Sequence, residues 1–379
     1  MVLETGRRLA ARGYDIHCVC IRAADAIVRE YNGAITFHEI GGPLSSEIGF
    51  WLGFRGSCRR VCDAIKSIVD DNSSRQTLLF PQVFPANWWG ASAMRAFPGL
   101  PCVWFCQEPS AFIHSRAWME ALPFPKNWIA RALHPVLKSV DLRCCRTYSH
   151  VLVNSEFSRL YTRRIYGFSE KDCHTVYLGV DLNRFTPDPQ VRRKHSVVVM
   201  CKLTRFKNVD RLIEAVAKLT SDGCEVRCEI VGTGDALPQL KELAIRLQVE
   251  SRVIFHGRVD DAAATTLLQQ ASVFCLASEE EPFGLVLIEA MACGTPVVAM
   301  YSGGPKEIIE GHDCGLLVES SSSGALAGAL RQLLADPATC ERMSQAAIVR
   351  AGQFNWDRTV AELEEHFRTA CEAGSCRGS

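Results

Sequence analysis

The sequence predicts an α/β protein made of two doubly wound, Rossmann-like domains that face a central cleft. Three observations support this prediction. Strand-like and helix-like segments alternate in both halves of the chain, which is typical of parallel βαβ units. The segment Thr-Pro-Asp-Pro at residues 186–189 interrupts this alternation and has the composition of a linker. The length of 379 residues is sufficient for two domains of ordinary size.

The first half of the chain contains both kinds of element in its pattern. Residues 1–12 form a helical pattern that Gly13 ends. Further on, the chain predicts strands at 16–21, 35–40, 77–80, 101–106 and 151–154, and helices at 56–70 and 128–146. A doubly wound domain usually opens with a strand and a glycine-rich turn. Because this sequence opens inside a helical pattern, we expect that strand and turn to be missing or displaced.

The second half shows the alternation more clearly. It predicts strands at 196–200, 225–231, 253–256, 273–277, 296–300 and 315–318, and helices at 209–220, 237–247, 262–271, 285–293, 305–310 and 324–335. We therefore expect an N-terminal domain at 1–188, a C-terminal domain at 189–354, and a terminal helix at 355–379 that packs back on the N-terminal domain. Ligands of such folds bind at the carboxyl ends of the strands, so the cleft between the domains is the expected site.

Composition excludes several classes of protein. Lys and Arg together number 42, as do Asp and Glu, so the formal net charge is zero. A protein that binds nucleic acid through bulk charge would be basic, and none is expected as a partner. The 18 cysteines form no CxxC pair and indicate free thiols in a reducing cytosol. No targeting segment and no apolar run long enough to cross a membrane is visible, which favours a cytoplasmic protein.

The strongest motif is an acidic loop between a predicted buried strand and a predicted helix. It reads Ser278-Glu-Glu-Glu-Pro-Phe-Gly284, and the helix that follows carries Glu289 within an apolar run. A helix N-terminus suits a phosphate group, and a carboxylate such as Glu289 can accept hydrogen bonds from two ribose hydroxyls. For an isolated glutamate, a helix-dipole partner or a solvated residue would be the simpler interpretation. The apolar surroundings of Glu289 disfavour a solvated face.

Two further patterns lie at predicted strand ends. Lys202 and Lys207 follow the strand at 196–200 and could neutralise a diphosphate, although a solvated basic loop would explain them equally well in isolation. Glycine pairs at 232/234 and 303/304 offer backbone donors or tight turns. The first pair lacks the third glycine of the dinucleotide fingerprint, because residue 237 is Leu, and this weakens an NAD interpretation.

Together these motifs resemble the retaining glycosyltransferases of family 4, which have the two-Rossmann GT-B fold. The resemblance covers most of the chain. It rests on Glu281-x7-Glu289 with Pro-Phe-Gly between, Lys202-Leu…Lys207-Asn208, Gly303-Gly304-x-x-Glu307, Gly179-Val-Asp181…Phe185-Thr-Pro187, and Asn154-Ser155. The tail from Phe354 resembles the terminal helix of the family.

The resemblance implies a role for each matched residue. Glu289 would hold the donor ribose. Glu281 and the backbone of Phe283 and Gly284 would hold the donor sugar, and Lys202 and Lys207 would hold the diphosphate in place of a metal ion. The remaining donor-side candidates are Leu285, Gly232 and Ser278, and the acceptor-side candidates are Glu108, Gln107, His114 and Asn154. No cofactor and no metal site are expected.

The chain departs from the family pattern in three places. Cys201 and Lys202 replace a Gly-Arg pair, and a lysine lacks the bidentate geometry of arginine. Gln107 occupies the position of a histidine often found in the family, with His114 nearby as a substitute. The early glycine loop is absent. These departures leave open a rival hypothesis, a non-catalytic sugar-nucleotide-binding homologue or partner subunit. An epimerase of the same fold would need acid and base groups that we cannot locate.

The predicted function is transfer of a sugar from a nucleotide diphosphate sugar to a glycan or lipid-linked hydroxyl. GDP-mannose is the leading donor, because Gln107-Glu108-Pro109 is similar to a His-Glu-Pro segment of mannosyltransferases, and a UDP-sugar stays open. Residues 118–146 combine aromatic and basic side chains, which suits either peripheral contact with a membrane or packing on the domain's own sheet. They are Trp118, Phe124, Trp128, Lys126, Arg131, Lys138, Arg143 and Arg146.

Overall fold

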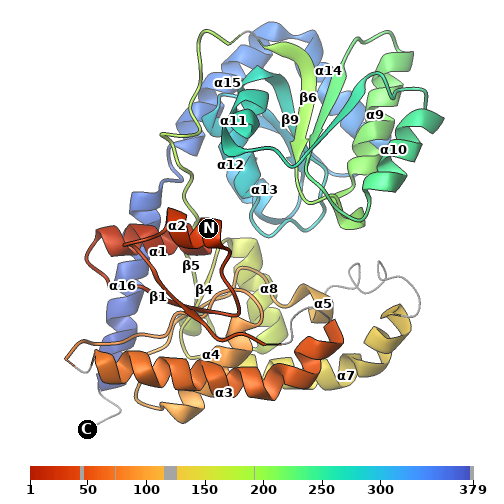
Figure 1. Ribbon diagram of the computed structural model, residues 1–379. Helices are drawn as coiled ribbons and strands as arrows, with labels where there is room; N and C mark the ends of the chain where they lie inside the picture. Colours follow the sequence, from red (N-terminus) through yellow and green to blue (C-terminus); the bar gives the residue numbers. More distant parts are fainter. Residues whose placement is uncertain (43–46, 73, 115–125, 192, 376–379) are drawn as a thin grey trace.

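The computed structural model consists of two α/β domains stacked on one another (Figure 1). It describes residues 1–42, 47–72, 74–114, 126–191 and 193–375. The predicted fold class, two Rossmann-like domains of parallel strands, is confirmed. Trp118 and Phe124, two of the aromatic residues in the 118–146 segment, lie outside the described residues.

The N-terminal domain contains two small parallel sheets. One pairs β1 with β2, and the other has the order β3-β4-β5. The strands are β1 (His17–Cys20), β2 (Thr36–Glu39), β3 (Trp104–Phe105), β4 (Val151–Val153) and β5 (Cys173–Thr175). The helices are α1 (Val2–Ala11), α2 (Asp25–Glu30), α3 (Glu47–Asp71), α4 (Ala86–Ala96), α5 (Ala111–His114), α7 (Lys126–Cys145) and α8 (Glu156–Tyr166).

Several N-terminal elements differ from the sequence prediction. The predicted strand at 77–80 is reduced to a single bridge, between Leu79 and Cys102, and Pro81 follows it directly. Helix α3 begins nine residues before the predicted start at Gly56. Helices α4 and α8 and strand β5 were not predicted. In α4 the apolar composition hides the helical period, whereas α8 has a clear N-cap in Ser155 and a left-handed C-cap in Gly167 that the sequence could have revealed.

The C-terminal domain is built on one six-stranded parallel sheet in the order β11-β10-β9-β6-β7-β8. The strands are β6 (Lys194–Met200), β7 (Arg227–Val231), β8 (Val253–Gly257), β9 (Ala271–Leu276), β10 (Val297–Met300) and β11 (Gly315–Val318). The helices are α9 (Val209–Ser221), α10 (Leu237–Arg246), α11 (Asp261–Gln270), α12 (Leu285–Ala292), α13 (Gly303–Ile309), α14 (Ser323–Ala335) and α15 (Pro337–Ala351). All of the predicted strands are present, and α15 is an additional helix.

Buried apolar residues explain why this sheet forms the more regular half. Val197, Val198 and Val199 in β6 are almost completely buried, as expected for a central strand covered by helices on both faces. The apolar face of α9 packs on the sheet through Leu212 and Val216. Parallel strands of this kind end at one edge of the sheet, so the loops that follow them are brought together there.

The last helix, α16 (Trp356–Ser375), leaves the C-terminal domain and runs along the N-terminal domain (Figure 1). Arg12 at the end of α1 forms an ion pair of 2.7 Å with Glu364 of α16. Phe367 of α16 packs against Phe80, with ring centroids 4.9 Å apart. No described helix is long and apolar enough to cross a membrane.

Candidate active site

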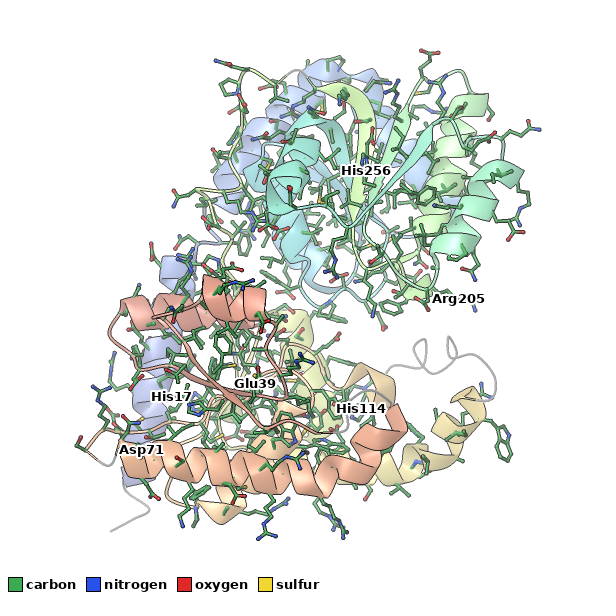
Figure 2. All side chains as sticks on the ribbon, viewed as in Figure 1. His17, Glu39, Asp71, His114, Arg205 and His256 are labelled. Carbon is green, nitrogen blue, oxygen red and sulfur yellow. The ribbon has the colours of Figure 1, made fainter. Side chains whose placement is uncertain are left out.

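Four loops come together at one edge of the six-stranded sheet. They follow β7, β6, β9 and β10, which are neighbours in the sheet in that order. These loops contain Gly232, Lys202 to Lys207, Ser278 to Gly284, and Gly303-Gly304, respectively. The topology thus gathers the donor-side residues that the sequence motifs indicated. Figure 2 shows Arg205, from the loop after β6, on the side of the C-terminal domain that faces the N-terminal domain.

Glycines are required where these loops touch one another. Gly232 has a φ angle of +131°, and a Cβ atom there would overlap the carbonyl oxygen of Cys201. The backbone N–H of Leu203 donates to the carbonyl oxygen of Thr233 at 3.0 Å, which fixes the loop after β6 against the loop after β7. Gly232 therefore has a structural role, and its proposed contact with a donor stays a prediction.

The second glycine pair supports the acidic loop in the same way. The N–H of Gly304 donates to the carbonyl oxygen of Glu281 at 2.8 Å. A Cβ atom on Gly303 would overlap that same oxygen, and one on Gly304 would overlap the backbone of Phe283. This contact with Gly303-Gly304 holds the backbone of the acidic loop in place without a ligand.

Lys207 and Glu281 form the central ion pair of the site. The Nζ atom of Lys207 lies 2.7 Å from Oε2 of Glu281, and the two side chains are only 19% and 15% exposed. Asn208, in the left-handed conformation at φ +51°, donates through Nδ2 to the carbonyl oxygen of Ala277 at 3.1 Å. This bond ties the lysine loop to the end of β9, next to the acidic loop. Two of the three predicted catalytic residues are therefore in direct contact.

The third predicted catalytic residue lies apart from this pair. Lys202 is exposed, and no ion pair of its side chain is present among the described residues. An unpaired exposed ammonium group is available to an anionic ligand. In the same two loops, the hydroxyl groups of Thr204 and Ser278 are buried and have no hydrogen-bond partner in the described part of the chain.

Glu108, from the N-terminal domain, faces the ion pair across the domain boundary. The surrounding protein raises the pKa of the Glu108 carboxyl group, although the residue is accessible to solvent. The charge of Lys207 lowers this pKa, and the charge of Glu281 raises it. These influences place Glu108 within electrostatic range of both residues. Gln107 beside it is half-buried and donates to Gln82 at 3.5 Å.

Glu289 lies in the middle of α12, the helix that follows the acidic loop. Its side chain is half-buried, and burial raises the pKa of its carboxyl group to about 7. The charge of Arg184 opposes this rise, and the charge of Asp261 adds to it. A carboxylate in such surroundings gains from any donor that approaches it, including sugar hydroxyls. The helix begins at Gly284, in the left-handed conformation at φ +92°.

Two donor-side candidates point into the protein core. Phe283 is 3% exposed. Its ring centroid lies 6.0 Å from that of Tyr177 and 6.0 Å from that of Phe354. Leu285 packs against the same core cluster. The side chain of Phe283 is therefore part of the core, and the predicted contact of its backbone with a donor sugar stays a prediction.

The acceptor-side candidates are divided. Asn154 is 5% exposed and its Oδ1 atom has no partner among the described residues, so it can accept a hydrogen bond. His114 instead lies 2.7 Å from the fully buried Asp141, which also accepts from Trp88 at 2.6 Å and from Tyr166 at 2.8 Å. Figure 2 shows His114 in the N-terminal domain. Its side chain is committed to this network, and its predicted substitution for the missing histidine stays untested.

Sequence reasoning missed the residues that join the two domains. The hydroxyl of Ser155, the N-cap of α8, donates to the carbonyl oxygen of Pro282 at 2.5 Å. Glu307 accepts from the backbone N–H of Glu156 at 2.8 Å and of Phe157 at 2.6 Å, the free donors at the start of α8. Tyr177 donates to the same carboxylate at 3.0 Å. The sequence placed Glu307 at the end of the Gly-Gly-x-x-Glu motif but indicated no contact with the other domain.

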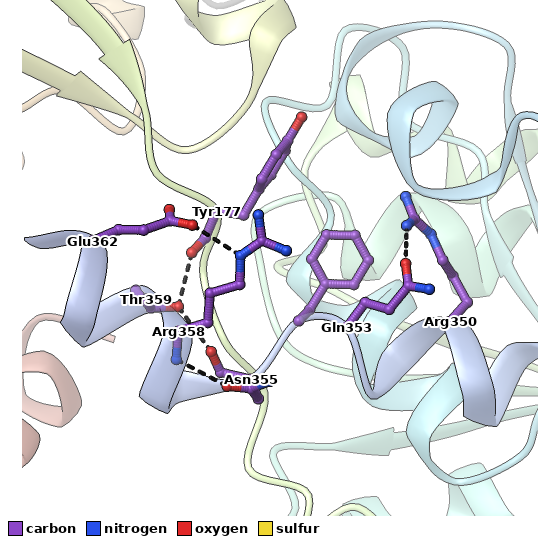
Figure 3. A pocket seen from close by; sticks show the side chains of 8 residues that line it. Tyr177, Arg350, Gln353, Asn355, Arg358, Thr359 and Glu362 are labelled. Atoms are coloured by element: carbon purple, nitrogen blue, oxygen red, sulfur yellow. Dashed lines mark hydrogen bonds and ion pairs between the residues drawn. The ribbon is translucent and has the colours of Figure 1, made fainter.

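A separate pocket lies where the chain passes from α15 to α16 (Figure 3). It is lined by Tyr177, Arg350, Gln353, Phe354, Asn355, Arg358, Thr359 and Glu362. The hydroxyl of Thr359 donates to the carbonyl oxygen of Tyr177 at 2.8 Å, which joins the crossover to the segment leading out of the N-terminal domain. None of these residues belongs to the four loops of the candidate site, so the pocket belongs to the domain crossover.

Comparison with solved structures identifies the same fold. A sucrose-phosphate synthase from Thermosynechococcus elongatus has a TM-score of 0.78 at 22% identity, covering 98% of this chain and 93% of that one. Anabaena HepE in complex with UDP and glucose has a TM-score of 0.75 at 20% identity, covering 96% and 94%.

Sequence comparison extends this result to the family. A D-inositol 3-phosphate glycosyltransferase of Mycolicibacterium paratuberculosis is 35% identical over 386 residues, covering 97% of this chain and 84% of the relative. Another from Kribbella flavida is 33% identical over 226 residues, covering 55% and 53%. The chain spans about half the length of several curated relatives that it matches. Residues 1–184 match the model of Glycosyltransferase Family 4 and residues 187–350 match that of Glycosyl transferases group 1, and the chain belongs to this family.

Proposed function

We propose that the protein is a retaining glycosyltransferase that moves a sugar from a nucleotide diphosphate sugar to an acceptor hydroxyl. The observation that carries this proposal is the Lys207–Glu281 pair, held at 2.7 Å between two sheet-edge loops and opposed by Glu108 of the other domain. A binding protein for sugar nucleotides needs the donor side alone. Glu108 belongs to the N-terminal domain and interacts electrostatically with Lys207 and Glu281. This contribution from the other domain favours a reaction in the cleft.

The proposed reaction uses the cations of the loop after β6. The bond between the anomeric carbon and the diphosphate oxygen breaks, and a bond from the acceptor oxygen to that carbon forms. The acceptor proton passes to the departing phosphate. Lys207 and the exposed Lys202 stabilise the negative charge that develops on the diphosphate, so we propose that no metal ion is needed for this step. Retention would follow from attack on the same face that the leaving group departs.

The donor-binding roles follow the positions of the side chains. Glu289 would accept hydrogen bonds from the two ribose hydroxyls. Ser278 and Thr204, whose buried hydroxyl groups have no partner among the described residues, would bond to the phosphate or the sugar. The backbone of Phe283 and Gly284, supported by Gly304, would bind the sugar hydroxyls.

The identity of the sugar and of the base stays a prediction. GDP-mannose rests on the Gln107-Glu108-Pro109 segment alone. The similar proteins include inositol phosphate glycosyltransferases and an N-acetyl-alpha-D-glucosaminyl L-malate synthase, and the structure of HepE contains UDP and glucose. The HepE complex supports a UDP-sugar as donor. The inositol phosphate and malate enzymes favour a small hydroxylated anion as acceptor beside the predicted glycan or lipid.

Helix α7 supports the proposed contact with a membrane surface. Its exposed apolar side chains include Trp128 at 72%, Val136 at 62% and Leu133 at 49%, on the same helix as the exposed Arg131 and Lys138. Packing on the domain's own sheet would bury such residues. Figure 1 shows the start of α7 at the side of the N-terminal domain away from α16.

A single assay tests the proposal. The purified protein is incubated with UDP-glucose, UDP-N-acetylglucosamine, GDP-mannose or GDP-glucose, each with and without D-inositol 3-phosphate, and released nucleotide diphosphate is measured. We expect turnover with one donor, lost in Lys207→Ala and kept in Lys218→Ala, an exposed lysine at the far end of α9. Tight donor binding without hydrolysis or transfer, across donors and acceptors, would instead support the non-catalytic homologue.

A further inference from the structure

Three histidines that are far apart in the sequence meet between the N-terminal domain and α16. They are His150, directly before β4, His174, in the middle of β5, and His366, on α16. One ring nitrogen from each lies within 4.8 Å of the others, and no second group of this kind is present in the described part of the chain. The spacing along the chain, which predicted no metal site, gives no sign of this cluster.

The sheet register explains how two of the rings meet. Leu152 of β4 pairs with His174 of β5. His150 precedes Leu152 by two residues, and side chains two residues apart lie on one face of a strand. His150 and His174 therefore share a face of the sheet, with ring centroids 5.2 Å apart.

Helix α16 supplies the third ring to the same face. The centroid of His366 lies 5.1 Å from that of His150 and 4.9 Å from that of His174. Phe367, the next residue, packs against Phe80, so the position of His366 is set by core contacts and not by the other histidines alone.

We propose that His150, His174 and His366 form a binding site for a divalent transition metal ion of the zinc class. The Nε2 atom of His150 and the Nδ1 atom of His366 are 3.0 Å apart. Two nitrogens bound at 2.0–2.1 Å to a tetrahedral Zn²⁺ ion would be about 3.3 Å apart. Small side-chain rotations are therefore enough to admit the ion.

A backbone contact fixes the protonation of the third ring. The Nε2 atom of His174 lies 3.0 Å from the carbonyl oxygen of Lys171. Because a carbonyl oxygen only accepts, Nε2 carries the proton and Nδ1 keeps its lone pair. Metal-binding histidines commonly donate their second ring N–H to a backbone carbonyl in this way.

The surroundings favour the uncharged imidazoles that a metal ion needs. Burial, reinforced by the neighbouring histidine rings, lowers the pKa of His150 and of His366 to about 4. All three residues are only partly buried, so an ion from solvent can reach them. Three nitrogen ligands leave one coordination position for water.

The site would fasten α16 to the N-terminal sheet. Helix α16 follows the C-terminal domain in the sequence, and Glu364 and Phe367 hold it against the N-terminal domain. A metal ion bound by both α16 and the N-terminal sheet would add a third attachment to the ion pair of Glu364 and the packing of Phe367. This role concerns stability and is independent of the proposed sugar transfer.

The test uses full-length protein without a histidine tag, treated with chelator and dialysed. Zn²⁺ is then titrated by calorimetry, and Co²⁺ by its visible absorption, with melting temperatures recorded in parallel. We expect one site per chain, the visible bands of tetrahedral cobalt without the charge-transfer absorption of thiolate ligands, and a melting temperature several degrees higher with Zn²⁺.

Variants decide which residues bind the ion. His366→Ala and His150→Gln should each abolish the site and the zinc-dependent rise in melting temperature, whereas His312→Ala, at an exposed histidine of the other domain, should keep both. His174→Gln serves as the third variant if either of the first two does not fold. Equal zinc binding by the folded variants and the parent, or no binding by the parent at micromolar Zn²⁺, would overturn the proposal and leave three stacked, uncharged rings.

Discussion

The ammonium group of Lys207 lies 2.7 Å from the carboxylate of Glu281, although 74 residues separate them in the sequence. They meet because β6 and β9 are adjacent in the sheet and both loops leave from the same edge. The pair holds a cation in a largely buried position without an uncompensated charge. When a diphosphate arrives, Lys207 can turn toward it while Glu281 becomes free for the sugar hydroxyls.

The first prediction follows from that exchange. Lys207→Ala should lower kcat by about 100-fold, because removing one group that stabilises developing charge typically costs 10²–10³ in rate. Steady-state kinetics with the best donor provides the measurement. Lys218→Ala, at an exposed lysine near the end of α9, is the control. A kcat within twofold of the parent would show that Lys207 does not act on the leaving group.

The second prediction concerns Glu289 and pH. Donor binding needs the ionised carboxylate, and burial raises the pKa of Glu289 to about 7, so affinity for the nucleotide sugar should rise from pH 6 to pH 8. Calorimetry in two buffers of different ionisation enthalpy should detect a proton released on binding near pH 6.5. Glu289→Ala should weaken binding by about 1–3 kcal/mol, since two hydroxyls lose a charged acceptor.

The second prediction also covers the stability of the folded chain, because the same raised pKa of Glu289 affects it. A carboxyl group with a raised pKa in the folded state adds stability below its unfolded pKa near 4.5, and this contribution is lost as pH rises through 7. Glu289→Gln, which stays neutral, should therefore melt higher than the parent at pH 8 and match it more closely at pH 5. A difference that does not change between these two pH values would contradict the raised pKa.

Sequence alone predicted most of the C-terminal domain, because strands such as β9 and β10 are runs of buried apolar residues and helices such as α9 are amphipathic. It predicted the N-terminal domain less well. Strand β3 has two residues and β5 has three, too short for a period to show, and their positions depend on pairing with β4. The loops predicted to bind the donor were chosen from their motifs, and the sheet order places them at neighbouring strands.

The contacts between the domains could not be predicted in this way. Glu307 reaches the start of α8 only because the two domains are placed against one another, and nothing in the spacing of Glu156 and Glu307 indicates it. The same holds for the meeting of His150 with His366, which are 216 residues apart. Motif arguments identify residues that converge within one sheet, whereas contacts across domains require the assembled fold.

The third prediction tests Glu307 as a link between the domains. Glu307→Ala removes the acceptor of two N–H groups at the start of α8, and hydrogen bonds to a charged group contribute about 1.5–3 kcal/mol. We expect a lower urea midpoint and a larger radius of gyration by X-ray scattering. Glu310→Ala, exposed near the end of the same helix, is the control. A compact, equally stable Glu307→Ala protein would rule out this role.

The fourth prediction concerns metal removal. Because Lys202 and Lys207 supply positive charge at the site, turnover should persist in excess EDTA at more than half of its untreated rate. EDTA-treated and untreated protein are compared at a temperature well below the melting point of both. Activity that is lost with EDTA and restored by Mg²⁺ or Mn²⁺ would show that the lysines do not replace a metal ion in the reaction.

The last prediction concerns α7 and anionic membranes. Near an anionic surface each cation contributes about 1 kcal/mol, so Arg131 and Lys138 act together with the exposed Trp128 although the net charge of the chain is zero. Local charge and exposed apolar area therefore decide the outcome. Wild-type protein should sediment with vesicles rich in phosphatidylserine at low salt, and less so as salt rises.

Reversal of charge on α7 provides the decisive variant. Arg131→Glu with Lys138→Glu should release the protein from the vesicles and leave donor affinity unchanged, because the donor loops lie in the other domain. Lys218→Glu with Lys241→Glu, two exposed lysines on α9 and α10, makes the same change in net charge and should stay bound. If the two double variants lose vesicle binding equally, bulk charge drives the association. If the wild type does not sediment at low salt, the exposed residues of α7 serve another purpose and the acceptor need not be a lipid.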